Sequence, residues 1–378
     1  MPSGVLYEDR QLGPFPLQRL KRVDRPTNLI TGDVKRIDGR ETAFLRAARG
    51  DYGEAVKRES SRRSRKYPLY TAQREVMYHL NTIKCNDVAP ARAPIPEDPK
   101  VLSRHIKRLG YFLKADIMGI CRLPESAVYS HDNQGNPIDI DYPWAIVIVM
   151  SKERQTLNAS NGNDWMGSPL SFQAYQPLGI AAHTIANYIR KLGYQASAQT
   201  AGQYQVLMPP LLLWAGIGEV SRAGIILNPF LGLGFKASAV LTDMPLAADK
   251  PIDFGLQDFC RQCQLCAQMC PSNAIPMGDK TMYNGYETWK LDERRCASFS
   301  MLNKHGTMCG KCVHVCPWNR PYAWQHNLVR WGIERSSLAR SLAIRADRAL
   351  GRGKEGGNDD EKWWFDLEDV DGVITIAH

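Results

Sequence analysis

The sequence lacks any apolar stretch long enough to cross a bilayer. Its longest apolar run, Val206 to Ile217, is about a dozen residues and contains Pro209 and Pro210, whereas a membrane-spanning helix needs about 20 residues. A secretory signal is also absent, because no apolar segment follows the charges near the N-terminus. The twin arginine Arg62-Arg63 is followed by charged and polar residues and does not resemble an export signal. We therefore expect a cytoplasmic protein without a membrane span.

Positive charge exceeds negative charge in the first fifth of the chain. Residues 1–70 hold 16 Lys and Arg against 9 Asp and Glu, and the whole chain has a net charge of +9. Such a segment can bind nucleic acid, an anionic cofactor or an acidic redox partner. The densest run, Arg62 to Lys66, carries none of the interleaved aromatic residues that stack on single-stranded nucleic acid. A solvated basic face is the interpretation we favour, and a nucleic-acid partner is not expected.

The composition does not indicate disorder. The chain has 378 residues, of which 44% are hydrophobic and 23% charged, as in ordinary globular proteins. Strands alternate with helices over about 100–250, which favours an α/β core. The expected strands are 115–122, 144–150, 224–227 and 235–242, and the expected helices are 101–113 and 178–192. The expected regions are a basic wrapping segment at 1–95, the core at 96–254, a cysteine domain at 255–320, and a tail at 321–378 with a flexible stretch at 351–358.

Most of the ten cysteines lie in one constellation. Cys260, Cys263, Cys266 and Cys270-Pro271 spell C-x2-C-x2-C-x3-C-P, the bacterial ferredoxin pattern, in which the fourth cysteine ligates the other cluster. A second copy, Cys309, Cys312 and Cys316-Pro317, lacks its first cysteine because Gly306 stands there, and Cys296 is the nearby replacement. We predict two [4Fe–4S] clusters. The predicted ligands are Cys260, Cys263, Cys266 and Cys316 for the first cluster and Cys270, Cys296, Cys309 and Cys312 for the second.

Structural zinc is the alternative interpretation of these cysteines. Two C-x2-C pairs can form a four-thiolate zinc site, but zinc requires neither the third cysteine nor the Cys-Pro step in both copies. A disulfide framework is disfavoured in a reducing compartment. Of the remaining cysteines, Cys121 is expected to pack as a small hydrophobic residue, and Cys85 has no role that we can assign. About 255 residues precede the constellation, which predicts a second cofactor or substrate site in the α/β part.

Several motifs together resemble a known family. Residues 224–246 read GIILNPFLGLGFKASAVLTDMPL, and CRQCQLCAQMCP, WKLDERRCASF, CGKCVHVCPWNR and the Trp363 to Asp366 signature follow. Over about 100–320 the sequence resembles the catalytic chain of the cobalamin-dependent reductive dehalogenases. The resemblance implies a corrinoid-binding, nitroreductase-like mixed-sheet core followed by a ferredoxin-like domain with two [4Fe–4S] clusters. That family binds cobalamin without a histidine on the cobalt, and here the eight histidines are scattered with no D-x-H-x-x-G loop.

The resemblance also implies site residues. Tyr175, just before the expected helix 178–192, corresponds to the family's proton donor, and Lys236 to the cation beside it. An adjacent cation stabilises the phenolate that a tyrosine leaves behind. Asn228, Gly232 and Gly234 are the implied corrinoid contacts. Without the family, Tyr175 would be a half-buried core residue and Lys236 a solvent-facing side chain.

Further expectations concern the substrate and the electron donor. A lysine at position 236, rather than an arginine, resembles the branch that acts on halogenated phenols, so a halogenated aromatic substrate is expected. Arg222 also matches a family position, but the sequence gives it no role. The chain ends about sixty residues past Cys316 without a fused reductase. We therefore expect electrons from a separate ferredoxin or flavin reductase.

One motif is dismissed and two alternatives stay open from the sequence. The segment from Gly232 to Ala237 fits a loose G-x-G-x-x-A dinucleotide pattern but leads into a β-branched segment, so the helix N-terminus that binds a pyrophosphate is missing. A tRNA-modifying enzyme like epoxyqueuosine reductase would suit the basic surplus, although its aspartate motif is not found. A non-catalytic two-cluster electron carrier would need no Tyr175.

Overall fold

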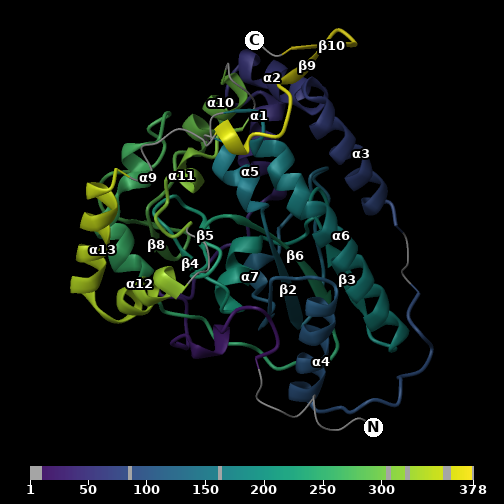
Figure 1. The fold of residues 1–378 in the computed structure, drawn as a ribbon. Helices are drawn as coiled ribbons and strands as arrows, with labels where there is room; N and C mark the ends of the chain where they lie inside the picture. The colour runs from purple at the N-terminus through teal and green to yellow at the C-terminus, as the bar shows by residue number, and fades with distance from the viewer. Residues whose placement is uncertain are drawn as a thin grey trace.

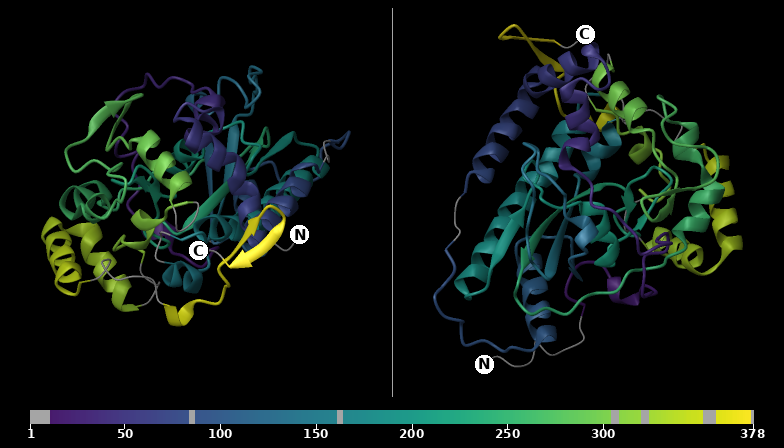
Figure 2. Two further views of the ribbon diagram at one scale, coloured as in Figure 1. Left: turned by 90° about the horizontal axis from the view of Figure 1, so that it is seen from above. Right: turned by 180° about the vertical axis from the view of Figure 1, so that it is seen from behind.

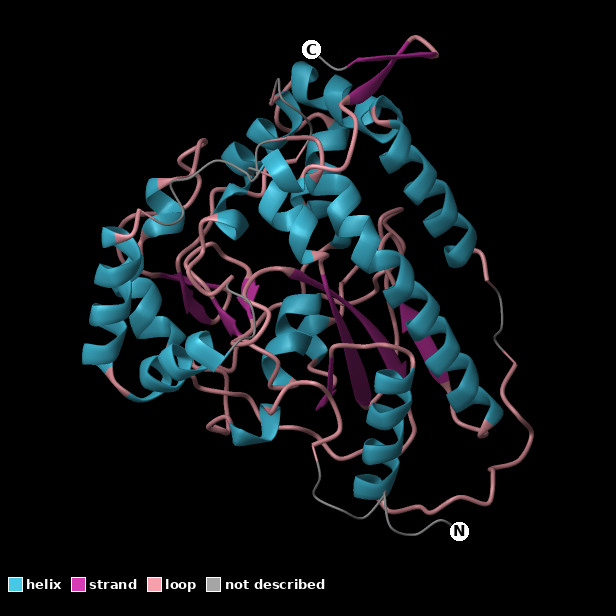
Figure 3. Cartoon of the chain, viewed as in Figure 1, coloured by secondary structure: helices cyan, strands magenta, loops and turns pink. Residues whose placement is uncertain are grey.

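The computed structural model describes residues 11–83, 87–160, 164–303, 308–319, 324–351 and 359–376 (Figures 1 and 3). The α-helices are α1 (Ala43–Arg49), α2 (Glu54–Lys66), α3 (Pro68–Asn81), α4 (Pro99–Phe112), α5 (Arg154–Ala159), α6 (Gly167–Lys191), α7 (Met208–Trp214), α8 (Leu256–Cys263), α9 (Leu265–Gln268), α10 (Glu293–Leu302), α11 (Lys311–His314), α12 (Trp324–Arg335) and α13 (Ser337–Ala349). The strands are β1 (Ile117–Arg122), β2 (Trp144–Ser151), β3 (Ala196–Gln199), β4 (Glu219–Val220), β5 (Ile226–Leu227), β6 (Phe235–Thr242), β7 (Thr281–Tyr283), β8 (Tyr286–Thr288), β9 (Leu367–Val370) and β10 (Val373–Ile376).

A four-stranded sheet of order β1-β2-β6-β3 forms the core, and its described pairs are antiparallel. The mixture of helices and strands that the sequence predicts is confirmed, and three of the expected strands lie in this sheet. The fourth, 224–227, forms only β5, which pairs with β4 outside the sheet. Successive residues of a strand point to opposite faces, so the continuous apolar run of β2 buries both of its faces.

Each face of the sheet is covered by helices. Ile146, Ile148 and Val240 pack on one side with residues of α4 and α6. Val147 and Leu241 pack on the other side with residues of α7. Figure 1 shows α6 running along the sheet beside β3 and β6. The core is therefore a layered structure whose two apolar faces are closed by different helices.

Helix α6 begins at Gly167, well before the expected start at residue 178. Pro177 lies inside the helix and does not begin or end it. A proline lacks the N–H that would continue the hydrogen-bond ladder, which is why the sequence favoured a helix that starts after it. Tyr175 therefore lies within the helix, and not in a loop before it.

The N-terminal segment runs along the outside of the molecule. Seen from behind, it extends over most of the length of the fold (Figure 2). Arg22 forms an isolated bridge with Ile252, and Leu29 forms one with Tyr286. Farther on, α3 packs on α6 and α2 packs on α10. The segment thus contacts both the sheet core and the cysteine region, while a boundary at residue 95 stays a prediction.

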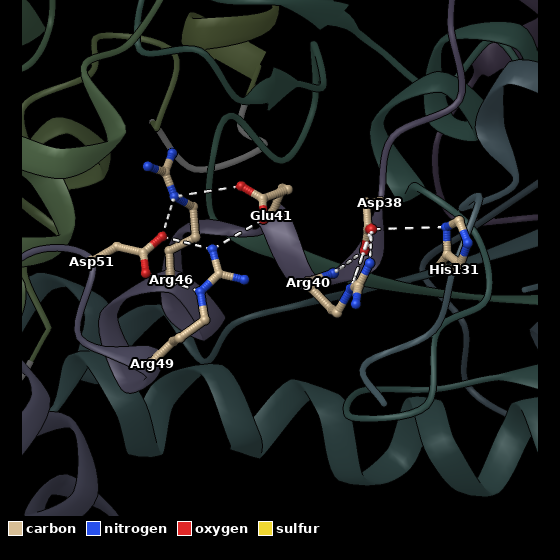
Figure 4. A network of polar contacts seen from close by, with 7 residues as sticks. All are labelled: Asp38, Arg40, Glu41, Arg46, Arg49, Asp51 and His131. Atoms are coloured by element: carbon tan, nitrogen blue, oxygen red, sulfur yellow. Dashed lines mark hydrogen bonds and ion pairs between the residues drawn. The ribbon is translucent and has the colours of Figure 1, made fainter. Parts of the chain in front are cut away.

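Part of the basic surplus in this segment is paired. Figure 4 shows a chain of polar contacts in which Arg40 bonds Asp38 at 2.6 Å and Arg49 bonds Asp51 at 2.6 Å. Glu41 bonds Arg49 at 3.0 Å. The hydrogen bonds from Arg40 lower the pKa of Asp38 to about 2. The basic face is therefore a network of alternating charges over this stretch.

Some sequence expectations fall on particular parts of the fold. Cys121 is buried in the cluster that includes α7, as expected for a small hydrophobic residue. Cys85, Gly306 and residues 352–358 of the expected flexible stretch lie outside the described residues. None of the helices in the described ranges has the length and apolar character of a membrane span.

Candidate active site and cluster-binding cysteines

Four cysteines line one pocket between α8, α9 and the segment after α11. The pocket contains Cys260, Cys263, Cys266 and Cys316, which we call the first group. Burial raises the pKa of the Cys260 and Cys266 thiols to about 12. Burial also raises the pKa of Cys316, and the other three thiols of the group raise it further. Buried thiolates this close to one another are unfavourable unless positive metal lies between them. The structure thus brings together the four residues predicted for the first cluster.

The other four cysteines form the second group: Cys270, Cys296, Cys309 and Cys312. Burial raises the pKa of Cys296 to about 11, and the nearby Cys309 and Cys270 thiols raise it further. Burial raises the pKa of Cys312 as well, with contributions from Cys266 and then from the other three members. Cys296, which lies on α10, therefore stands where the missing cysteine of the second motif would be needed.

The chain reverses sharply between the cysteines of the first group. Gln264 has a φ of 56°, in the left-handed region, and it separates α8 from α9. This turn lets Cys263, at the end of α8, and Cys266, on α9, face the same pocket. Few side chains adopt this conformation without a tertiary constraint, so the turn is part of how the site is built.

Tyr175 and Lys236 come together across α6 and β6. The Lys236 Nζ lies 5.1 Å from the centre of the Tyr175 ring. Lys236 pairs with Met150 in the sheet, and Val240 on the same face packs toward α6. Lys236 therefore points to the α6 side, next to the predicted proton donor. The distance is that of a cation near an aromatic ring.

Lys152 is a site residue that sequence reasoning missed. It directly follows β2, and its backbone N–H donates to the Gly234 carbonyl at 2.8 Å. Burial and the neighbouring Lys236 ammonium lower the pKa of Lys152 to about 7, and the Cys312 thiol offsets part of this shift. Lys152 is thus close both to Lys236 and to the second group. The available signal was a lysine immediately after a buried apolar strand.

Tyr204 is a second missed residue. Its Oη donates to the Ala237 carbonyl at 2.8 Å. Burial raises its pKa, and the nearby Tyr175 raises it further. Ser238 is fully buried, and its hydroxyl faces Tyr204 and offsets part of these pKa shifts. Two tyrosines, two lysines and a buried hydroxyl thus surround the same end of β6.

Comparison with known proteins places this site in context. Residues 259–320 match a family described as a 4Fe-4S dicluster domain. The catabolic reductive dehalogenase NpRdhA, solved in complex with 3-bromo-4-hydroxybenzoic acid, is 37% identical with a TM-score of 0.92, over 97% of this chain and 54% of that chain. Nearly the whole chain is thus similar to part of a reductive dehalogenase.

Two further members of the reductive dehalogenase family show the same relation. A reductive dehalogenase structure that suggests a mechanism for B12-dependent dehalogenation is 37% identical with a TM-score of 0.92, over 97% of this chain and 54% of that chain. The tetrachloroethene reductive dehalogenase of Sulfurospirillum multivorans is 29% identical over 301 residues, which are 69% of this chain and 59% of that protein. The chain spans about half the length of the two structures.

The dicluster match decides between two interpretations of the cysteines. It covers all eight predicted ligands, and it favours two [4Fe–4S] clusters over a zinc site. The glycine-rich segment leads into β6 and not into a helix, as expected from the sequence.

The three implied corrinoid contacts of the reductive dehalogenase family all have structural roles in the loop before β6. Asn228 is buried, donates to the Ile217 carbonyl at 2.6 Å and accepts from the Phe230 N–H at 2.8 Å. Gly232 has a φ of +61°, and a side chain there would overlap Asn319. Gly234 accepts the Lys152 N–H. Their contact with a corrinoid stays a prediction.

Proposed function

We propose that this chain is a cobalamin-dependent reductive dehalogenase that replaces the halogen of a halogenated phenol by hydrogen. The observation that carries the proposal is the Tyr175–Lys236 pair, which lies 5.1 Å apart and adjoins Lys152, itself close to Cys312. A proton donor, two lysines and a candidate cluster ligand thus lie next to one another in space, from Tyr175 on α6 to Cys312 of the second group. The related structure with 3-bromo-4-hydroxybenzoic acid supports the substrate class.

The first part of the proposal concerns the clusters. We assign the first group to one [4Fe–4S] cluster and the second group to the other. Eight buried or half-buried thiols in two sets of four supply the soft, anionic ligands that iron prefers. Because Lys152 is near Cys312, the second cluster is proposed to lie on the active-site side.

The second part concerns the corrinoid. The half-buried side chains of Lys152 and Lys236 form no ion pair within the described ranges. Together with the buried Ser238 hydroxyl beside Tyr204, they fit a bound group that accepts hydrogen bonds. We propose that Asn228, Gly232 and Gly234 present the loop that borders this group. When bound, a corrinoid supplies the low-potential reductant that breaks the carbon–halogen bond.

The chain's own residues supply the proton and its control. Replacing halogen by hydrogen consumes two electrons and one proton and releases halide. Tyr175 donates the proton from its Oη, and Lys236 stabilises the phenolate that remains. Lys152, whose pKa is lowered to about 7, becomes a second cation when an anionic phenolate substrate binds beside it and favours its protonated form. Tyr204 holds the backbone of β6 through Ala237 beside the reacting groups.

The alternatives receive less support. The similarity to a reductive dehalogenase structure covers 97% of the chain. The short aspartate motif of epoxyqueuosine reductases is not found in the sequence. A pure electron carrier gives no reason for a tyrosine and two lysines at one end of β6. A cytoplasmic location and a separate ferredoxin or flavin reductase as electron donor remain part of the proposal.

Metal analysis and one variant pair test the function. Protein produced with cobalamin is expected to contain about eight irons and one cobalt and to dehalogenate a brominated phenol. Tyr175→Phe is expected to lower turnover by about 10²- to 10⁴-fold with unchanged metal content. Tyr188→Phe is the matched control, because Tyr188 lies on the same helix and bonds His105 at 2.9 Å. Undiminished turnover in Tyr175→Phe, or eight irons without cobalt, would sink the assignment.

A further inference from the structure

Arg222 is a buried cation that forms no ion pair with a carboxylate in the described part of the chain. Its side chain is only 2% exposed. The Nε donates to the Cys260 carbonyl at 3.0 Å, and the Nη1 donates to the Pro276 and Gly278 carbonyls at 2.8 and 3.0 Å. Asp279 acts on the Arg222 charge only from beyond ion-pair distance. The neutral carbonyls satisfy the Nε and Nη1 donors but carry no opposite charge, and a buried cation is unfavourable without one.

The compensating charge has an evident place. Arg222 lines the same pocket as the four cysteines of the first group. Four thiolates around a [4Fe–4S] core make an anion, and reduction by one electron makes it more negative. Burial lowers the pKa of Arg222, and the negative charge of the Cys266, Cys260 and Cys263 thiolates offsets part of this shift. The guanidinium therefore has its missing counter-ion when the cluster is present.

A buried indole group points to the same conclusion. The Trp318 Nε1 is buried and has no hydrogen-bond partner in the part of the chain that is described. Trp318 lines the pocket of the first group. Trp289 stacks beneath Arg222, with the guanidinium carbon 4.5 Å from the ring centre. Unsatisfied donors are unfavourable in a protein interior unless an acceptor is supplied, and cluster sulfurs are such acceptors.

We propose that Arg222 is the built-in counter-cation of the first cluster and raises its reduction potential. Net charge and hydrogen bonds to sulfur are among the main determinants of such potentials. A buried cation stabilises the more negative reduced state more than the oxidised state. Electron transfer to the first cluster therefore becomes more favourable. The inference rests on the proposed two-cluster function and gives a role to an arginine that the sequence left unexplained.

The chain offers a matched control for burial. Arg348 donates to the backbone carbonyl of Cys263 at 2.8 Å, much as Arg222 donates to that of Cys260. Arg348, however, is exposed to solvent. Water screens an exposed charge, so Arg348 is expected to influence the cluster much less.

The test is a redox titration of the iron-loaded full chain, with each cluster followed by electron paramagnetic resonance. Arg222→Gln is expected to lower the reduction equilibrium constant of the first cluster at least tenfold, which is about 59 mV for one electron. Arg348→Gln is expected to change it by less than threefold. Arg222→Lys, which keeps the charge, should lie between wild type and Arg222→Gln. A first-cluster potential that is unchanged in Arg222→Gln with full iron content would overturn the inference.

A second variant covers the case in which Arg222→Gln does not bind iron. Trp318→Phe keeps an aromatic ring but removes the unpaired N–H, and it is expected to lower the same potential by a smaller step. If Trp318→Phe also leaves the potential unchanged, the inference is overturned. Because the titration needs no cobalamin and no organohalide, its result does not depend on dehalogenation. A wild-type chain with a single cluster signal would instead refute the two-cluster function.

Discussion

The sheet core and the cysteine region bury their side chains in different ways. In the core, β2 carries six consecutive buried residues, and the long helices α4 and α6 cover one face of the sheet while the shorter α7 packs on the other. In the cysteine region, α9 and α11 have four residues each, and buried thiols take the place of a continuous apolar run. Helices this short are not stable by themselves in water. The comparison teaches that the core is held by apolar packing, whereas the cysteine region depends on what its thiols bind.

Removing one cluster ligand should have the largest effect, because it should destabilise the cysteine region and leave the sheet core intact. Cys316→Ser takes a buried thiolate from the first group, so the chain is expected to hold about four irons in place of about eight. Proteases should then cleave within residues 255–319 while the sheet core resists. Iron analysis and limited proteolysis measure both effects. Cys121→Ser, in the core, is the control, and full iron in Cys316→Ser would contradict the ligand assignment.

A cavity in the core should have the opposite signature. Ile148 is fully buried on the α6 side of the sheet, and Ile148→Ala is expected to lower the free energy of unfolding by about 2–5 kcal/mol. Denaturant titration measures the loss, and iron per folded chain should not change. Ile180→Ala, on the exposed face of α6 at 53% exposure, is the matched control. Loss of iron in Ile148→Ala would show that the two regions are not independent in this sense.

The hydrogen bonds that connect the sheet core to the cysteine region are expected to contribute less to the free energy of unfolding than the interior of either region. The Asn319 Oδ1 accepts from the Leu233 N–H at 2.6 Å, and its Nδ2 donates to the Val313 carbonyl. Asn319→Ala leaves the Leu233 donor unpaired, and the expected loss is about 1–3 kcal/mol. The core and the cysteine region should then unfold in separate steps. Asn319→Asp, which keeps the acceptor, should show a smaller loss. A single unchanged transition in Asn319→Ala would refute the coupling.

The charge network of the N-terminal segment should give the smallest effect. The pKa of Asp38 is lowered to about 2 by Arg40. A depressed carboxyl pKa contributes stability above the unfolded value near 3.9, and this contribution is lost as the pH falls toward 2. Arg40→Ala should therefore raise the pKa of Asp38 toward its ordinary value, as followed by NMR titration, without a measurable change in Tm at pH 7. A changed Tm at pH 7 would contradict the view that this surface pairing is marginal.

Regular elements with a clear apolar pattern were predictable from the sequence. Strand β6 occupies 235–242 as expected, because a short, mostly apolar run that is buried on both faces favours a central strand. The start of α6 was not predictable in the same way, because Pro177 is a helix breaker by local rules and tertiary packing overrides it. The antiparallel order of the sheet also depends on contacts that no local pattern contains.

The candidate site divides along the same line. The spacing of the cysteines predicts both groups except for Cys296, since the other members belong to two copies of a known ligand pattern. The position of Lys152 near both Lys236 and Cys312 required the fold, because these residues are far apart in the chain. Asn228 shows the reverse case. The resemblance implies a contact with the corrinoid, whereas in the structure its side chain forms hydrogen bonds within its own loop and to the Ile217 carbonyl.

Pro177 divides α6 into two parts that differ in backbone hydrogen bonding. It has no N–H to donate to the carbonyl of Gln173, so the turn that carries Tyr175 has one hydrogen bond fewer than the rest of the helix. From Leu178 onward the helix packs on the sheet and its amides should exchange slowly with solvent. The amides around Tyr175 should exchange faster. The hydroxyl that is proposed to meet the substrate is thus carried by the turn of α6 that can adjust most easily to aromatic rings of different shape.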